Sequence, residues 1–246
     1  MGAKTLQVTL IAHTPFPEEV IALAGRRCYS SLDNAALQER VTQESPGEFI
    51  KKLMGMGHVT PIEHASFTFA VEGVSRSLLA QITRHRIASF SVQSQRYVGE
   101  TAAKNPEGVF DYIIPPRIQA LGPGAVEEFG RQMREIQNWY DRWVEALGGG
   151  RDAYEDARFV LPNAAETKFV FTMNARELWH FFTLRLCFRA QWEIRALAEE
   201  MLKLVRRVAP TVFARAGPAC VRGPCPEGEM NCGRIQEARE KYRQSK

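Results

Sequence analysis

The chain has 246 residues, 45% of them hydrophobic and 24% charged, which is the composition of a globular protein with a sizeable core. Its 32 basic and 28 acidic residues leave a net charge of +4, too small to indicate a general binder of nucleic acid or membrane. No segment resembles a signal peptide or a membrane span, and the odd number of cysteines, five, fits a reducing compartment, so we expect a cytoplasmic protein.

The first part of the chain alternates between strand and helix patterns. Residues 6–12 predict an opening strand, and residues 18–28 and 46–54 predict helices. Residues 64–74 carry apolar side chains at every second position, which predicts a strand with one buried face. Ser75 is expected to cap a helix that runs to about Arg86. The serine-rich stretch that follows is predicted to be a loop.

The second part is mainly helical. After a short strand over 111–114, residues 126–147 predict a long amphipathic helix that three glycines, 148–150, bring to an end. Residues 168–172 predict another strand. Asn174 is expected to cap a helix that runs to about Phe188, and residues 191–208 predict one more helix.

These elements predict an α/β (α+β) fold, with a small mixed or antiparallel sheet flanked by helices. We expect one compact domain over residues 1–215. The remaining residues, 216–246, form a basic tail rich in Cys, Gly and Pro, which we expect to wrap the surface.

The segment RHRIASFSVQSQRY, residues 84–97, concentrates groups that bind anions. If Arg84 and Arg86 lie on one helix, they point about 200° apart at roughly 100° per residue, so they cannot share one ligand. Either two anions bind, or one arginine serves the structure. The simpler reading is that these cations face solvent and complement a helix C-terminus. The hydroxyls and the arginine fork that follow, from Ser89, Ser91, Ser94 and Arg96, favour a nucleotide.

The segment HVTPIEH, residues 58–64, lacks the spacing that places two histidines on one helical face, so we expect no metal there. Thr60 before Pro61 instead predicts the start of a helix, whose free amides could bind an anion or simply form a structural turn. There is also no glycine fingerprint for a Rossmann or P-loop nucleotide site.

The cysteines are read as structural. Cys220, Cys225 and Cys232 are not arranged as paired CxxC motifs, so inert thiols are favoured over a zinc or iron–sulfur site. Cys28 and Cys187 lie among apolar neighbours and are predicted to be buried core cysteines.

Taken together, several segments resemble one family. RHRIASFSVQSQR fits the pattern RHRxxSxxxxSxR of the flavin-dependent thymidylate synthases. HVTPIEHASFTF, ARFVLP, TMNARELWHFFTLR and AQWEI are similar to other shared segments of that family, and they occur in the same order. The resemblance covers most of residues 5–215 and becomes weaker in the tail.

The resemblance implies a homotetramer with shared active sites and FAD bound without a Rossmann fold. The implied reaction is the reductive methylation of dUMP to dTMP, with methylenetetrahydrofolate as carbon donor and NADPH as reductant. As in the family, no cysteine would attack the uracil ring. Membrane and nucleic-acid partners are not expected.

The resemblance also implies roles for individual residues. The FAD-binding residues would be Thr60, Glu63, Arg84, His85, Arg86, Ile87, Asn174, Arg176 and His180. The dUMP-binding residues would be Gln81, Arg84, Ser94, Gln95, Arg96, Arg158 and Arg185. Arg185 is also the candidate catalytic cation beside the pyrimidine, and Arg176 the candidate cation at the flavin edge, because fixed cations stabilise developing negative charge.

The sequence departs from the family pattern at three positions. Ser91 stands where many members have asparagine, Val92 where some have glutamate, and Arg189 where some have a histidine near the flavin.

Two other functions stay open. One is a nucleic-acid-binding module, which the modest net charge disfavours. The other is a flavoprotein of the same fold that acts on another nucleotide, or an inactive homologue.

Overall fold

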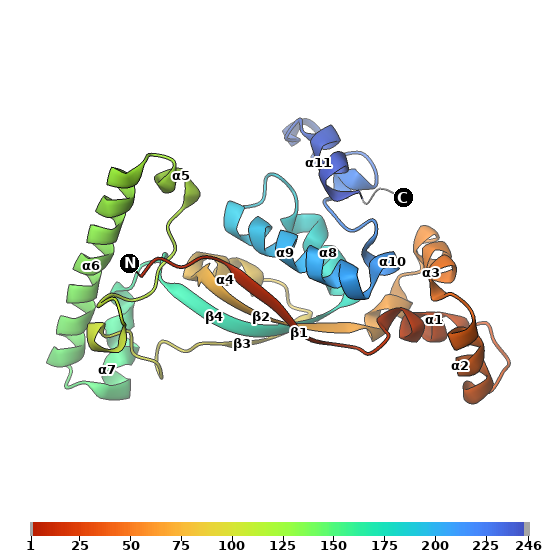
Figure 1. The fold of residues 1–246 in the computed structure, drawn as a ribbon, viewed down its shortest axis with the longest axis horizontal. Coiled ribbons are helices and arrows are strands. Elements are labelled where there is room, and N and C mark those ends of the chain that lie inside the picture. The colour runs from red at the N-terminus through yellow and green to blue at the C-terminus, as the bar shows by residue number, and fades with distance from the viewer. Residues whose placement is uncertain (1, 244–246) are drawn as a thin grey trace. The chain divides into compact units, whose positions relative to one another are not determined.

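The computed structural model describes residues 2–243. Its four strands form one antiparallel sheet with the order β1-β2-β4-β3. The strands are β1 Gln7–His13, β2 Ser66–Ser75, β3 Ala88–Val92 and β4 Glu166–Asn174, and Figure 1 labels each of them. The α+β fold with a small sheet and flanking helices is therefore confirmed.

By their contacts, the described residues form two units, and the division falls within each of the four strands. The first unit contains the residues up to Gln7, Val71–Arg84 and Phe90–Val170. The second unit contains Val8–Ala70, His85–Ser89 and the chain from Phe171 onward.

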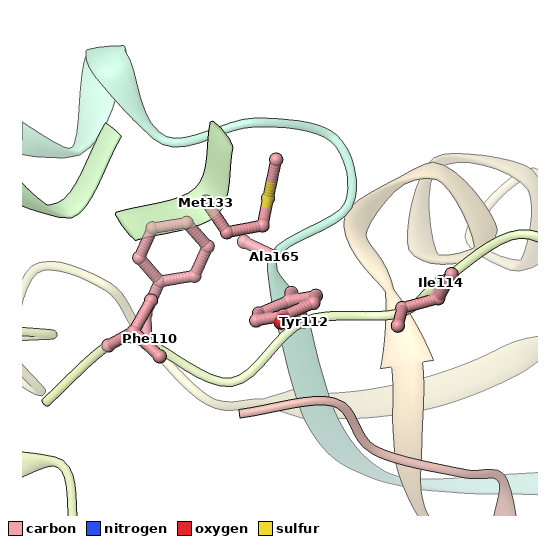
Figure 2. Packing of buried hydrophobic residues seen from close by; sticks show 6 residues of the cluster. Phe110, Tyr112, Ile114, Met133 and Ala165 are labelled. Atoms are coloured by element: carbon pink, nitrogen blue, oxygen red, sulfur yellow. The ribbon is translucent and has the colours of Figure 1, made fainter. Parts of the chain in front are cut away.

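The first unit is built around a long helix. Its helices are α4 Arg76–Ile82, η2 Ala102–Lys104, α5 Pro116–Gln119, α6 Pro123–Ala146, α7 Gly150–Ala157 and η3 Arg158–Val160. Met133 of α6 packs with Phe110, Tyr112 and Ala165 in a buried cluster (Figure 2). Buried apolar area of this kind supplies most of the stability of a helix that covers a core.

Helix α6 also carries a polar side chain into this core. The Gln137 side chain is buried, accepts a hydrogen bond from the Phe110 amide at 2.7 Å and donates one to the Glu100 carbonyl at 2.8 Å. Because a buried amide is costly unless it is paired, these bonds fix the loop before Tyr112.

The backbone at Gly73 in β2 leaves no room for a side chain. Gly73 has a φ of +70°, and a Cβ added there would lie 1.9 Å from the Thr5 carbonyl oxygen. Its amide donates a hydrogen bond of 2.7 Å to Glu166 of β4. Only glycine combines this backbone conformation with so close an approach.

The second unit contains the remaining helices of the described residues. They are α1 Pro17–Arg27, α2 Asn34–Gln43, α3 Pro46–Gly55, η1 Thr60–His64, α8 Ala175–Arg185, α9 Trp192–Val208, α10 Pro210–Phe213, η4 Ala219–Val221, η5 Gly228–Met230 and α11 Ile235–Tyr242. Helices α8, α9 and α10 lie side by side (Figure 1). Their core contains the buried rings of Phe67, Phe182 and Phe213, with centroids 5.5 Å apart for Phe67–Phe213 and 5.9 Å for Phe182–Phe213.

Three local predictions were wrong. The helix capped by Ser75 ends at Ile82, not near Arg86, so the RHR residues lie in the turn and extended segment that follow it. Residues 88–92, predicted as loop, form β3, because Phe90 packs against Phe169 with centroids 6.5 Å apart. The expected strand over 111–114 forms only isolated bridges at Tyr112.

Candidate active site

The RHR segment presents alternating exposed and buried side chains. His85 is buried, with 4% of its surface exposed, whereas its neighbours Arg84 and Arg86 are exposed. Ile87 follows with 68% of its surface exposed, which is unusual for a large apolar residue. The expectation that the two arginines serve different ligands rested on a helix that the segment does not form.

His85 lies at the centre of a hydrogen-bonded chain within the second unit. Its Nδ1 is 2.9 Å from Oε1 of Glu177, and its Nε2 accepts a hydrogen bond of 3.1 Å from Nε of Arg185. An arginine can only donate, so Nε2 must be unprotonated and Nδ1 must carry the proton. The network therefore selects one neutral tautomer of His85.

Burial supports the same protonation state. Desolvation lowers the pKa of His85 most strongly, the hydrogen bond to Glu177 opposes it, and the Arg185 charge lowers the pKa further. The Glu177 carboxylate is itself buried, with 7% of its side chain exposed. His85 thus connects a buried carboxylate to the predicted catalytic arginine.

This network is a poor metal site despite its ligand types. Ligand atoms of His85, Glu177 and His180 lie within 4.8 Å of one another. However, both ring nitrogens of His85 already have partners, and one of them faces the Arg185 cation, which would repel a metal ion.

Sequence reasoning named His85, His180 and Arg185 but missed Glu177. In the sequence, Glu177 resembles an ordinary acidic residue in the first turn of a helix. Its position four residues before Phe181, a ring that packs edge-on against His85 with centroids 5.0 Å apart, was the available signal that it faces inward.

The start of α8 holds the other predicted flavin residues. Asn174 caps the helix as predicted, since its side chain accepts from the Glu177 amide at 2.9 Å. Arg176 forms an ion pair with Glu63 of η1, and both side chains are about half exposed. The start of η1 differs from the prediction by one residue: Thr60, expected to cap the helix before Pro61, is its exposed first residue, and Val59 precedes it without a side-chain capping bond.

These residues fit a flavin nucleotide. Arg86 and Arg176 offer exposed cationic groups to a pyrophosphate or to an anionic ring edge. The exposed Ile87 offers an apolar surface to a flat ring. A chain with these donors needs no glycine-rich loop to bind an anionic dinucleotide.

The predicted dUMP residues other than Arg185 lie in the first unit. Arg96 forms an ion pair with Glu155, and Arg158 donates from Nε to the Glu155 carbonyl at 2.9 Å. The Ser94 hydroxyl accepts a hydrogen bond of 3.2 Å from the Arg96 amide. Of these residues, Arg96 contacts the Glu155 carboxylate, Arg158 contacts the Glu155 backbone, and Ser94 contacts the Arg96 backbone. Gln81 donates a hydrogen bond to the Ser77 carbonyl of its own helix, and within residues 2–243 no hydrogen bond or ion pair joins the Gln95 side chain to this group.

Arg76 is a further cation in this unit that sequence reasoning missed. It donates from Nη2 to the Gln93 carbonyl at 3.2 Å, whereas its Nε is buried without a hydrogen-bond partner among the described residues. Burial lowers the pKa of Arg76, the Glu100 charge raises it, and the Arg158 charge lowers it. Two arginines within electrostatic range, one with an unpaired donor, suit a dianionic phosphate.

No helix among the described residues has the length and apolar character needed to cross a membrane.

Comparisons with known proteins agree on one family. The family model described as "Thymidylate synthase complementing protein" matches residues 9–211. A flavin-dependent thymidylate synthase of Geobacter sulfurreducens is 49% identical over 241 residues, covering 97% of this chain and 99% of the relative. One from Clostridium tetani is 46% identical, covering 98% of this chain and 100% of the relative.

A solved structure supports the fold. The UMP/dUMP methylase PolB from Streptomyces cacaoi, crystallised with 5-Br dUMP, superposes with a TM-score of 0.68. It covers 85% of this chain and 93% of its own, at 23% identity, so the likeness concerns the fold alone. The resemblance that the RHR segment indicated is confirmed: this chain belongs to the flavin-dependent thymidylate synthases.

Proposed function

We propose that this chain catalyses the reductive methylation of dUMP to dTMP, with methylenetetrahydrofolate as carbon donor and NADPH as reductant. The observation that carries the proposal is the 49% identity, over 97% of this chain, with a flavin-dependent thymidylate synthase. In addition, the central histidine of the RHR motif contacts Arg185. Family membership makes the chain a flavin-using methyltransferase.

The predicted binding residues divide between the two units. FAD would be held by residues of the second unit, Thr60, Glu63, His85, Arg86, Ile87, Asn174, Arg176 and His180, and by Arg84 at the end of the first. The phosphate of dUMP would be held by Arg96, Arg158 and the newly identified Arg76, with Gln81, Arg84, Ser94 and Gln95 as further contacts. FAD, when bound, would carry hydride from the reductant to the pyrimidine, which brings the transferred methylene carbon to the oxidation level of a methyl group.

Arg185 is the proposed catalytic residue. Hydride addition places negative charge on the pyrimidine carbonyls, and a fixed guanidinium stabilises that charge as it develops. Glu177 and His85 hold the Arg185 side chain through two hydrogen bonds, so little reorganisation accompanies the reaction. Because His85 stays neutral, it orients Arg185 without adding a competing positive charge.

We also propose the assembly and location that the family implies. The active chain would be a homotetramer in the cytoplasm, where its nucleotide and folate substrates occur. The exposed Trp139 and Trp143 on α6, with 43% and 54% of their surface exposed, are candidates for an interface between subunits. Residues 1–215 would form the catalytic domain, with 216–246 as an appended tail.

The decisive assay combines the chain with FAD, dUMP tritiated at C5, methylenetetrahydrofolate and NADPH under anaerobic conditions. Release of tritium with formation of dTMP is the expected result. Tritium release without dTMP would indicate another pyrimidine reaction, and neither product would indicate an inactive homologue. Salt-dependent binding of single-stranded nucleic acid by a colourless protein would favour the alternative module.

A further inference from the structure

Four of the five cysteines lie in the last part of the second unit. Cys187 follows the end of α8, and Cys220, Cys225 and Cys232 lie in the tail. All four thiols are free; Cys220 is buried and the other three are half-buried. Cys28, predicted to be a core residue, is instead exposed at the end of α1.

The residues beside Cys187 hold the loop that contains Cys225 and Cys232. Arg189 donates from Nη1 to Glu227 at 2.9 Å and to the Met230 carbonyl at 2.6 Å. The Arg234 guanidinium lies 4.0 Å from the centroid of the Phe188 ring. These contacts fix the segments on both sides of Cys232 against the turn at Cys187.

A second set of contacts joins the segment around Cys220 to α8. Arg222, two residues after it, donates from Nη2 to Thr183 of α8 at 2.8 Å. The Arg222 guanidinium also lies 4.6 Å from the centroid of the Trp179 ring. The Cys220 carbonyl accepts from Nε of Arg239 at 3.0 Å, so the short helix η4 is tied both to α8 and to α11.

The thiols of Cys187, Cys225 and Cys232 all lie close enough to the Cys220 thiol to act on it electrostatically. The hydrogen bonds of Arg189, two residues after Cys187, reach Glu227 and Met230, which each lie two residues from Cys225 or Cys232. Four free thiols in one neighbourhood are the ligand set of a structural zinc site or of an iron–sulfur cluster.

The spacing of the sulfurs distinguishes between metal centres. Zinc binds thiolates at about 2.3 Å, which places four sulfurs within about 4 Å of one another. Within residues 2–243, the only group of three or more ligand atoms within 4.8 Å of each other is the His85 network, so the cysteine sulfurs are spread more widely. A four-iron cluster requires wider spacing, because each thiolate binds a different iron.

We propose that Cys187, Cys220, Cys225 and Cys232 ligate a [4Fe–4S] cluster that fastens the tail to the end of α8. Pattern reading missed this site because it considered only the three tail cysteines and placed Cys187 in the core. The fold supplies the fourth ligand. The proposal is independent of the methylation reaction, since it concerns metal content alone.

The test is the metal content of the full-length protein purified without oxygen. We expect about four irons and four acid-labile sulfides per chain, and an electron paramagnetic resonance signal after reduction that persists when FAD has been removed. Cys225→Ser and Cys232→Ser should each lose more than half of the iron. Cys28→Ser, which alters the one cysteine outside the group, should keep all of it.

Two results would overturn the proposal. One is stoichiometric zinc in place of iron and sulfide. The other is wild-type protein that contains neither metal, even after anaerobic reconstitution with iron and sulfide. The wild-type measurement decides the question even if a serine variant fails to fold.

Discussion

Glu177 offers a sharp test of the hydrogen-bonded chain through His85. Replacing it with alanine leaves the buried Nδ1–H of His85 without its acceptor at 2.9 Å. A buried donor that loses a charged partner costs about 1.5–3 kcal/mol, so we expect Glu177→Ala to lower the free energy of unfolding by about 2 kcal/mol. Glu177→Gln keeps an acceptor oxygen at the same place and should recover most of that loss.

The same substitution should also change the steady-state kinetics of the enzyme. Without Glu177, Arg185 loses the oriented histidine that accepts its Nε–H. We therefore expect kcat to fall about tenfold in Glu177→Ala, with a smaller change in the KM for dUMP, because the arginine remains but is no longer held in place.

Urea denaturation of the flavin-free protein and steady-state kinetics of the loaded enzyme measure the two effects independently. NMR of the imidazole nitrogens gives a third readout, the Nδ1–H tautomer of His85. If Glu177→Ala unfolds like the wild type and His85 keeps its tautomer, then Glu177 does not position His85 and the reasoning fails.

The remaining predictions concern pH, each ligand and the fold. Burial lowers the pKa of His85 in the folded state, so this residue should contribute its full stability above the unfolded pKa of about 6.5. As the pH drops below that value, the free energy of unfolding should fall by up to about 1.4 kcal/mol per pH unit. Urea titrations at pH 7.5 and 5.5 test this, and the same decline in His85→Gln would contradict it. Arg176→Ala should weaken FAD binding by about tenfold in a fluorescence titration, since a charge-assisted contact is lost, whereas Arg131→Ala on the surface of α6 should not change it. Arg158→Ala should weaken dUMP binding about 10- to 100-fold by calorimetry, and unchanged affinity would remove Arg158 from the site. Gly73→Ala should destabilise the protein by more than about 3 kcal/mol, whereas Gly124→Ala, where a Cβ meets open space, should be nearly neutral.

The sequence was informative where local rules dominate. The cap of Asn174 on α8 and the turn at glycines 148–150, all three with positive φ, follow from side-chain chemistry and backbone sterics that act within a few residues. The family itself was predictable because the RHR segment combines six fixed positions in a pattern that packing alone does not require.

The sequence was less informative where distant segments meet. The contact between His85 and Glu177 joins residues 92 positions apart, so no local rule identifies Glu177 as the partner of His85. Helix α4 stops at Ile82, and β3 begins at Ala88, where the chain pairs with the distant strand β4 and Phe90 packs against Phe169. The grouping of Cys187 with the tail cysteines likewise depends on the fold.

The most direct test of the proposed function is a difference spectrum of the flavin. The purified protein is saturated with FAD, excess dUMP is added, and the spectrum without dUMP is subtracted, so that any other chromophore cancels. The account predicts bound FAD whose visible bands shift on addition of dUMP, as expected when substrate and flavin share one site. A protein that binds no FAD, or bound FAD whose spectrum is indifferent to dUMP, would contradict it.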